Sequence, residues 1–153
     1  VFFPLSLPGL AAGALIVFVR TAFRANGADV PGEPFAAFYR AGDFFHEGSP
    51  GTEVAFEVTR DDVVVLKRRT SAFAGTDLDL VLRARGVDSL ALTGVATSAM
   101  VAATLYDASD RGYGLTVLRD GCADQDPAVH EFLVDNVFRA RGAKILSCAE
   151  WLR

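Results

Sequence analysis

The chain has 153 residues, of which 51% are hydrophobic, and it carries a net charge of −4 at pH 7. This length suits one domain with a single core, and the apolar content favours a buried parallel sheet over disorder. The acidic balance, with basic residues gathered only at Lys67-Arg68-Arg69, argues against nucleic acid as a partner. Two cysteines and two histidines at scattered spacings match neither a disulfide scaffold nor a zinc pattern. We therefore expect a cytoplasmic protein without a metal or a cofactor.

Residues 1–19 contain no charged side chain, which raises the question of a membrane segment. The run is barely as long as the about 20 apolar residues that a spanning helix needs. Two prolines and two glycines interrupt it, and no basic region precedes it as in a signal peptide. We expect a buried strand at 14–20 instead, and the alternative of a membrane anchor predicts that the protein depends on detergent.

From residue 60 onward, apolar runs alternate with amphipathic helical patterns. Continuous β-branched runs such as Val63-Val64-Val65-Leu66 are typical of strands buried on both faces. In chain order the predicted strands are 14–20, 63–67, 89–93, 115–119 and 144–147, and the predicted helices are 76–85, 98–111 and 127–141. Since single helices connect the later strands, we predict a three-layer α/β/α Rossmann-like domain with a parallel sheet.

The ends of these helices carry recognisable signals. Thr76 is predicted to cap the first helix, and Asp126 followed by Pro127 is a strong start signal for the last one. Each helix is expected to end before a glycine: Gly86, Gly112 and Gly142.

Residues 21–60 are rich in glycine, proline and phenylalanine and show weak periodicity. The phenylalanines of this segment could line a pocket, but we favour the interpretation that they pack the loop onto the sheet. They are Phe35, Phe38, Phe44 and Phe45.

The segment Thr93–Val101 combines a strand end, a tight turn of small residues and a helix start, a layout that builds anion sites. Further short motifs accompany it along the chain: Ser49-Pro50-Gly51-Thr52-Glu53, Lys67-Arg68-Arg69, Gly75-Thr76-Asp77-Leu78, Asp107-Ala108, Arg111-Gly112-Tyr113, Asp120, Ala123-Asp124 and Val129-His130-Glu131. In this order and spacing, from about residue 15 to residue 152, the sequence resembles the isochorismatase-like cysteine hydrolase superfamily.

The resemblance implies an Asp-Lys-Cys triad in which the thiolate attacks an amide or imine carbon. Lys67 matches the family's lysine, and Met100 stands where the family has the nucleophilic cysteine. The Val95–Ala96 bond corresponds to the family's cis peptide, and the N–H groups of Ala96 and Met100 correspond to its oxyanion donors. Thr97 belongs to the same binding segment.

The departures from the family pattern affect the chemistry directly. The thioether of Met100 has no ionisable proton and cannot form a thiolate. The family's aspartate ends a first strand at the centre of the sheet, whereas no aspartate precedes Asp29 here. Residues 1–13 are too few for a parallel strand and its crossover, and Pro4 is unsuited to a central strand. We therefore expect a single domain over 1–153 that is N-terminally incomplete, as a fragment or with residues 1–7 filling the gap.

These losses predict an isochorismatase-like domain that is catalytically impaired or inactive, a pseudoenzyme. Isochorismatases of the superfamily hydrolyse a vinyl ether with Asp and Lys alone, so Met100 by itself does not exclude activity, but the missing aspartate removes the general acid. The alternative is a non-catalytic module that binds a small carbonyl or carboxylate ligand or oligomerises. We expect a small-molecule ligand and a homo-oligomer.

Three other residues could approach the site from the ends of later strands. Cys122 and Asp120 lie near the end of one predicted strand, and Cys148 follows the last one. For both cysteines we favour a buried structural thiol over a substitute nucleophile.

Overall fold

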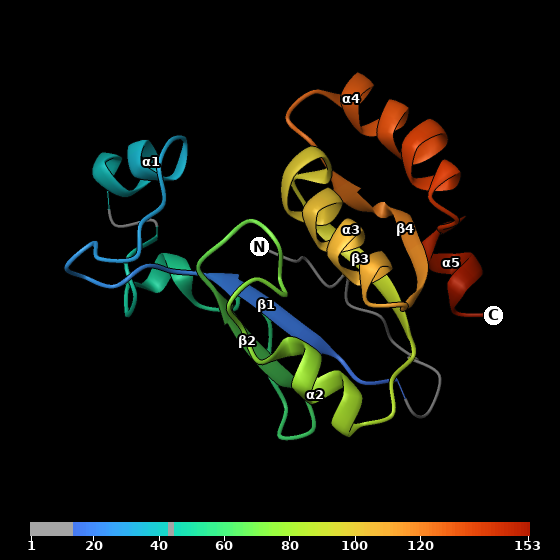
Figure 1. Ribbon diagram of the computed structural model, residues 1–153, viewed down its shortest axis with the longest axis horizontal. Coiled ribbons are helices and arrows are strands. Elements are labelled where there is room, and N and C mark those ends of the chain that lie inside the picture. Colours follow the sequence, from blue (N-terminus) through green and yellow to red (C-terminus); the bar gives the residue numbers. More distant parts are fainter. Residues whose placement is uncertain (1–13, 43–44) are drawn as a thin grey trace.

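The computed structural model describes residues 14–42 and 45–153, which form two parallel sheets (Figure 1). One sheet pairs β1 (Val17–Thr21) with β2 (Val63–Lys67). The other has the order β3-β4-β5, formed by β3 (Ser89–Val95), β4 (Gly114–Ala123) and β5 (Lys144–Leu146). Every strand pair is parallel, so the prediction of a parallel α/β fold is confirmed. Among the described residues, however, no backbone pairing joins the two sheets.

The strand predictions were accurate in position and differ mainly at the ends. Strand β2 coincides with the predicted 63–67, and β1 starts three residues later than the predicted 14–20. Strand β4 extends to Ala123 because its pairing with β3 shifts register between Leu92 and Gly94. Gly121 lies at this irregularity, where an added Cβ would come within 2.9 Å of Thr93 Cγ2.

The predicted helices are all present, but two of them are divided. The structure contains α2 (Leu78–Ala84), the π-helical turn η3 (Thr97–Val101), α3 (Ala102–Asp110), α4 (Pro127–Phe132), the π-helical η4 (Leu133–Phe138) and α5 (Cys148–Trp151). The Asp126 side chain accepts a hydrogen bond from Ala128 N, as predicted for a helix cap. The cap predicted at Thr76 is wrong by one position, because Asp77 occupies the N-cap of α2. The Thr76 hydroxyl still accepts a hydrogen bond from Leu78 N at 3.2 Å.

The segment expected to be irregular contains two short helices, α1 (Phe35–Ala41) and the 3₁₀ turn η2 (Pro50–Thr52). Phe23, which follows β1, is fully buried and contacts the rings of Phe35 and Phe45 edge-on. The packing interpretation holds for these two phenylalanines. Phe38 remains half exposed, and Phe44 lies outside the described residues.

The main core lies between the sheets and their helices. Its most deeply buried members are aliphatic and aromatic side chains from β2, α3, β4 and η4: Val65, Leu105, Val117, Val134 and Phe138. Tertiary contacts connect β4 with α3, α4, η4 and α5, so this strand is the centre of the larger unit in Figure 1.

The uncharged segment at the start of the sequence is only partly covered by the structure. Its end forms β1, whereas residues 1–7, which were considered as a filling of the sheet, lie outside the described residues. Within the described part of the chain, no helix is long and apolar enough to cross a membrane.

Two phenylalanines of one helical segment allow a matched test of the core. Phe138 is fully buried, and Phe132, six residues earlier, is 61% exposed. We expect Phe138→Ala to lower the free energy of unfolding by about 3–5 kcal/mol, because it removes a buried ring and leaves a cavity. Phe132→Ala should change it by less than about 0.5 kcal/mol. Urea denaturation measures both values, and equal losses would contradict this description of the core.

Candidate active site

Lys67 is the last residue of β2, and its side chain is fully buried. The ammonium group donates a hydrogen bond from Nζ to the carbonyl oxygen of Arg69 at 2.8 Å. Among the described residues no carboxylate lies within salt-bridge distance of it. Burial lowers the pKa of Lys67 from 10.5 to about 8, because the charged form loses hydration that the single hydrogen bond to Arg69 does not offset. The lysine is therefore mostly protonated at pH 7, but it loses its charge within about a pH unit above that.

The turn after β3 has an unusual backbone. The peptide bond between Val95 and Ala96 is cis, and Ala96 occupies the N-cap position of η3. The Ala96 carbonyl accepts hydrogen bonds from Ala99 N and Val101 N, both at 3.2 Å, which closes the first turn tightly. Met100 lies within this turn and is partly exposed. The oxyanion role assigned to the Ala96 and Met100 amides stays a prediction.

Lys67 and Met100 lie on different sheets. Lys67 ends β2 of the two-stranded sheet, and Met100 follows β3 of the three-stranded sheet. Both follow the carboxyl ends of parallel strands, where open α/β sheets bind ligands. Among the described residues no hydrogen bond connects the two, so their convergence on one ligand stays a prediction.

Thr97 lies inside the protein and supports the turn. Its side chain is fully buried, and Oγ1 shares a 2.8 Å hydrogen bond with Nδ1 of His130, which is itself 8% exposed. The sequence analysis placed Thr97 among the binding residues and mentioned His130 only within a family motif. The sequence offers one signal for His130, which is its position four residues after the helix cap Asp126. That position does not reveal that its hydrogen-bond partner is Thr97, 33 residues away.

An internal carboxylate binds one amide of the turn after β3. Asp124 Oδ2 accepts a 2.6 Å hydrogen bond from Ser98 N, and Oδ1 accepts one from Gln125 N at 2.8 Å. Burial raises the pKa of Asp124, but the hydrogen bonds from Ser98 and Gln125 outweigh it, and the pKa is lowered overall. The ionised carboxylate therefore holds the start of η3 against the end of β4. A ligand anion would have to use other N–H groups of the turn.

Both cysteines have the surroundings of structural thiols. Burial raises the pKa of Cys122 to about 12, and its thiol contacts the carbonyl oxygen of Leu92 at 3.8 Å. Burial first, and then the nearby Asp120 carboxylate, raise the pKa of Cys148 to about 11. Asp120 accepts a hydrogen bond from Cys148 N at 2.7 Å. Both thiols are free and stay protonated at neutral pH, as expected for structural cysteines.

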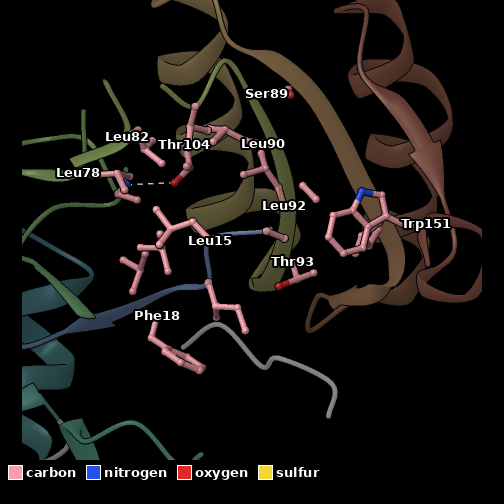
Figure 2. Close-up of a pocket in the computed structure, with 18 of the residues that line it drawn as sticks. Leu15, Phe18, Leu78, Leu82, Ser89, Leu90, Leu92, Thr93, Thr104 and Trp151 are labelled. Atoms are coloured by element: carbon pink, nitrogen blue, oxygen red, sulfur yellow. Dashed lines mark hydrogen bonds between the residues drawn. The ribbon is translucent and has the colours of Figure 1, made fainter. Parts of the chain in front are cut away.

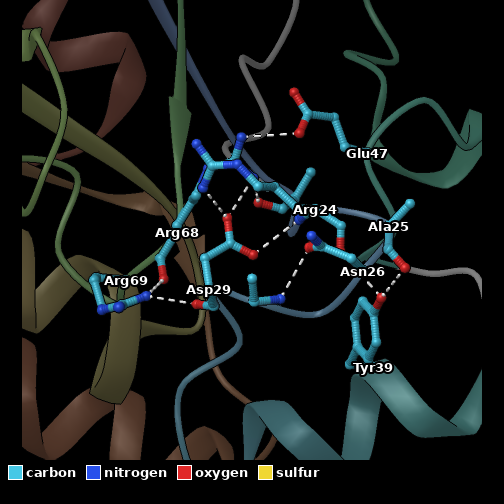
Figure 3. A network of polar contacts seen from close by, with 10 residues as sticks. Arg24, Ala25, Asn26, Asp29, Tyr39, Glu47, Arg68 and Arg69 are labelled. Carbon is cyan, nitrogen blue, oxygen red and sulfur yellow. Dashed lines mark hydrogen bonds and ion pairs between the residues drawn. The ribbon is translucent and has the colours of Figure 1, made fainter.

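The first aspartate of the sequence has a structural role (Figure 3). The Asp29 carboxylate contacts Arg24 at 2.8 Å and Arg68 at 3.0 Å, and Arg68 also contacts Glu47 at 2.9 Å. Arg69 donates to the backbone oxygen of Asp29 at 2.9 Å. Burial raises the pKa of Asp29, but the Arg24 amide and the Arg68 guanidinium outweigh it and lower the pKa overall. This network ties the loop after β1 to the end of β2 and satisfies the charges next to Lys67.

These features define a Rossmann-type α/β protein whose candidate site lies at the carboxyl ends of its parallel strands. The chain belongs to the isochorismatase family, because the family model for the isochorismatase domain matches residues 10–150.

Individual relatives agree with this assignment. The isochorismatase family protein YecD of Escherichia coli O157:H7 is 30% identical over 142 residues, which cover 93% of this chain and 74% of YecD. Ureidoacrylate amidohydrolase RutB of Methylobacterium radiotolerans is 40% identical over 91 residues, covering 60% of this chain but only 33% of RutB. The crystal structure of an isochorismatase family protein from Desulfovibrio vulgaris superposes with a TM-score of 0.81 at 33% identity. That superposition covers 88% of this chain and 72% of the other.

The buried lysine gives a pH-dependent stability prediction. Its folded pKa of about 8 lies below the unfolded value of 10.5, so the folded state binds fewer protons between these values. The burial penalty is therefore full below pH 8 and disappears as the pH rises toward 10.5; it amounts to about 3 kcal/mol. We expect Lys67→Met to be more stable than the wild type at pH 7, with an advantage that shrinks above pH 8. Urea denaturation at pH 7, 8, 9 and 10 measures this, with the exposed Lys144→Met as control.

The Thr97–His130 hydrogen bond gives a second prediction. Thr97→Val keeps the shape of the side chain but leaves His130 Nδ1 buried without its partner. The free energy of unfolding should fall by about 1–3 kcal/mol. Ser98→Ala, a change at the exposed neighbour, should have little effect in the same denaturation experiment. Equal effects of the two substitutions would show that the hydroxyl does not support the turn.

Proposed function

We propose that this chain is an isochorismatase-family domain that is catalytically impaired in this form. The observation that carries the proposal is Met100, which follows the cis-peptide turn at the position of the family's nucleophilic cysteine. A thioether cannot be deprotonated, so the covalent route through a thiolate is closed at this position.

The remaining ionisable groups support the same proposal. Cys122 and Cys148 are buried and have raised pKa values, so neither thiol is activated at neutral pH. Among the described residues Lys67 has no carboxylate partner that would serve as a general base or acid. Asp29 and Asp120 are both held as ionised hydrogen-bond acceptors, which makes them poor proton donors.

The same argument weakens the isochorismatase-type reaction. That chemistry needs no thiol, but it needs an acid that protonates the substrate's vinyl ether. A lysine with a pKa of about 8 is the one candidate that we find among the described residues. Without a carboxylate beside it, proton transfer and substrate orientation would both rest on this single group.

The second candidate function is binding of a small carbonyl or carboxylate ligand without turnover. It is favoured by the backbone of the turn, which does not depend on the Met100 side chain, and by Lys67, about nine-tenths protonated at pH 7. A cytoplasmic setting, supported by two free thiols, and a homo-oligomeric state belong to the same proposal.

An activity screen tests the first candidate. We expect no turnover of nicotinamide, ureidoacrylate, N-carbamoyl compounds or isochorismate above the rate without protein. Lys67→Ala serves as the matched control, because any activity of the site should need this lysine. Turnover by the wild type that disappears in Lys67→Ala would refute the impairment.

Restoring the thiol tests the reason for the impairment. We expect Met100→Cys alone to remain inactive, since no positioned aspartate deprotonates the new thiol. Mass spectrometry after incubation with substrate would detect an acyl-enzyme. A covalent intermediate with turnover would show that the base is present after all.

Thermal shift with nicotinate and benzoate tests the second candidate. Binding to the folded state raises the melting temperature in a saturable manner. We expect this response in the wild type and its loss in Lys67→Ala. A response that survives in Lys67→Ala would place the ligand elsewhere.

A further inference from the structure

The sheet of β1 and β2 has two edges, which differ in their surroundings. The edge of β1 borders an apolar cavity of about 590 Å³ whose other side is formed by β3 (Figure 2). Beyond the strand this edge is already in use, because Phe23 pairs with His46 and donates a 2.7 Å hydrogen bond to Phe45 O. The edge of β2 lies on the side of β1 remote from β3 (Figure 1), and among the described residues it has no strand partner.

The backbone of β2 alternates between its partner strand and this free edge. Val63 N donates to Ile16 O at 3.0 Å, and residues 63–67 pair with residues 17–21 of β1. Odd-numbered residues of β2 therefore bond to β1, and the alternation of a strand directs the N–H and C=O groups of Val64 and Leu66 to the opposite side. Within the described part of the chain these groups have no backbone partner.

The usual features that keep an edge strand from pairing are absent within β2. Proline, a β-bulge and an outward-facing lysine are the common ones. Residues 63–67 contain no proline, pair with β1 in an unbroken register, and have one lysine, Lys67, whose side chain is fully buried. Val64 is 42% exposed, and neither Val64 nor Leu66 packs on the main core. The free edge therefore carries partly exposed apolar side chains.

The charges that flank β2 are opposite at its two ends. Asp61 and Asp62 precede the strand, and Arg68 and Arg69 follow it. The Asp61 side chain is 87% exposed, and Arg69 is exposed as well. A parallel partner copy would place like charges beside each other, whereas an antiparallel copy places the acidic start of one strand beside the basic end of the other. The strand is therefore complementary to itself in the antiparallel direction.

We propose that this edge is a dimer interface, at which β2 pairs antiparallel with β2 of a second copy of this chain. The two-fold axis passes beside Val65, so that Val64 lies opposite Leu66 of the second copy and Asp61 lies beside its Arg69. Any other register would leave strand residues unpaired and separate these charges. The two sheets of β1 and β2 then become one. This inference rests on the homo-oligomeric state proposed above, and it assigns the surface that forms it.

Sedimentation equilibrium of the 153-residue chain tests the interface, and we expect a monomer–dimer equilibrium. Val64→Pro removes an outward N–H but leaves the odd-numbered bonds to β1 in place, so dimerisation should weaken by about tenfold or more. If the proline prevents folding, Val64→Lys is the second variant, because an exposed lysine protects an edge strand from pairing. The matched control is Phe132→Lys, a change at an exposed apolar residue of α4, which should leave the dimer unchanged.

Charge reversal tests the antiparallel direction. Asp61→Arg and Arg69→Asp should each weaken the dimer by about three- to tenfold at low salt, because each places like charges together at both ends of the interface. A mixture of the two variants should form heterodimers about as strongly as the wild type, since both charge pairs are then restored. A mixture that associates no better than either variant alone would overturn the antiparallel register.

Hydrogen exchange locates the contact independently. As the protein concentration rises, exchange should slow at the amides of Val64 and Leu66, which face the second copy. It should stay unchanged at Val63 and Val65, because their amides already bond to β1. Protection of Val64 and Leu66 that does not depend on concentration would overturn the proposal, because the chain would then cover its own edge.

The remaining outcomes separate this interface from the function proposed above. A chain that stays monomeric would overturn both the interface and the homo-oligomeric state. A dimer that survives Val64→Pro and Val64→Lys would overturn the interface alone. A dimer that Phe132→Lys dissociates would also overturn it, and would place the contact on α4. None of these measurements involves turnover, so this test and the activity screen can fail separately.

Discussion

The need of a buried parallel sheet to satisfy its backbone groups is the constraint on which this structure depends. Within the described residues the strands pair in two separate sets, β1 with β2 and β3 with β4 and β5, so β1 and β3 are each edge strands. Side-chain packing and the α2 connection, not backbone hydrogen bonds, hold the two sets beside each other. The candidate site is divided in the same way, since Lys67 belongs to one set and Met100 follows a strand of the other. The relative position of the two site halves therefore depends on side-chain packing between the two sheets.

Much of the fold could be predicted because its signals are local. Four consecutive β-branched or apolar residues at 63–66 indicate a strand buried on both faces, and the helix cap at Asp126 is a short-range hydrogen bond. The division of two helices into π-helical and α-helical parts was missed, because it depends on how η3 and η4 pack rather than on their composition. Helix α1 was missed for a similar reason, since its stability comes from Phe35 packing on Phe23.

The candidate site was predictable only where a motif fixes a position. The family resemblance placed Lys67 at a strand end and a cis peptide at Val95–Ala96, and the structure contains both features. The contacts that support them join residues 26 to 40 positions apart, such as Ser98 with Asp124, Thr97 with His130, and Asp29 with Arg69. No periodicity or spacing in the sequence encodes such pairs. The role of Asp29 could not be predicted for the same reason, because the folding of the loop after β1 brings its carboxylate to Arg24 and Arg68.

The turn after β3 is supported independently of the side chain at position 100. Thr97 and Ser98 are held from the β4–α4 side by His130 and Asp124, and none of these contacts involves the Met100 side chain. Lys67 is likewise held within its own strand end by Arg69. Within the described residues, each half of the site therefore has supporting contacts of its own, and their relative position is set by the side-chain packing between the two sheets.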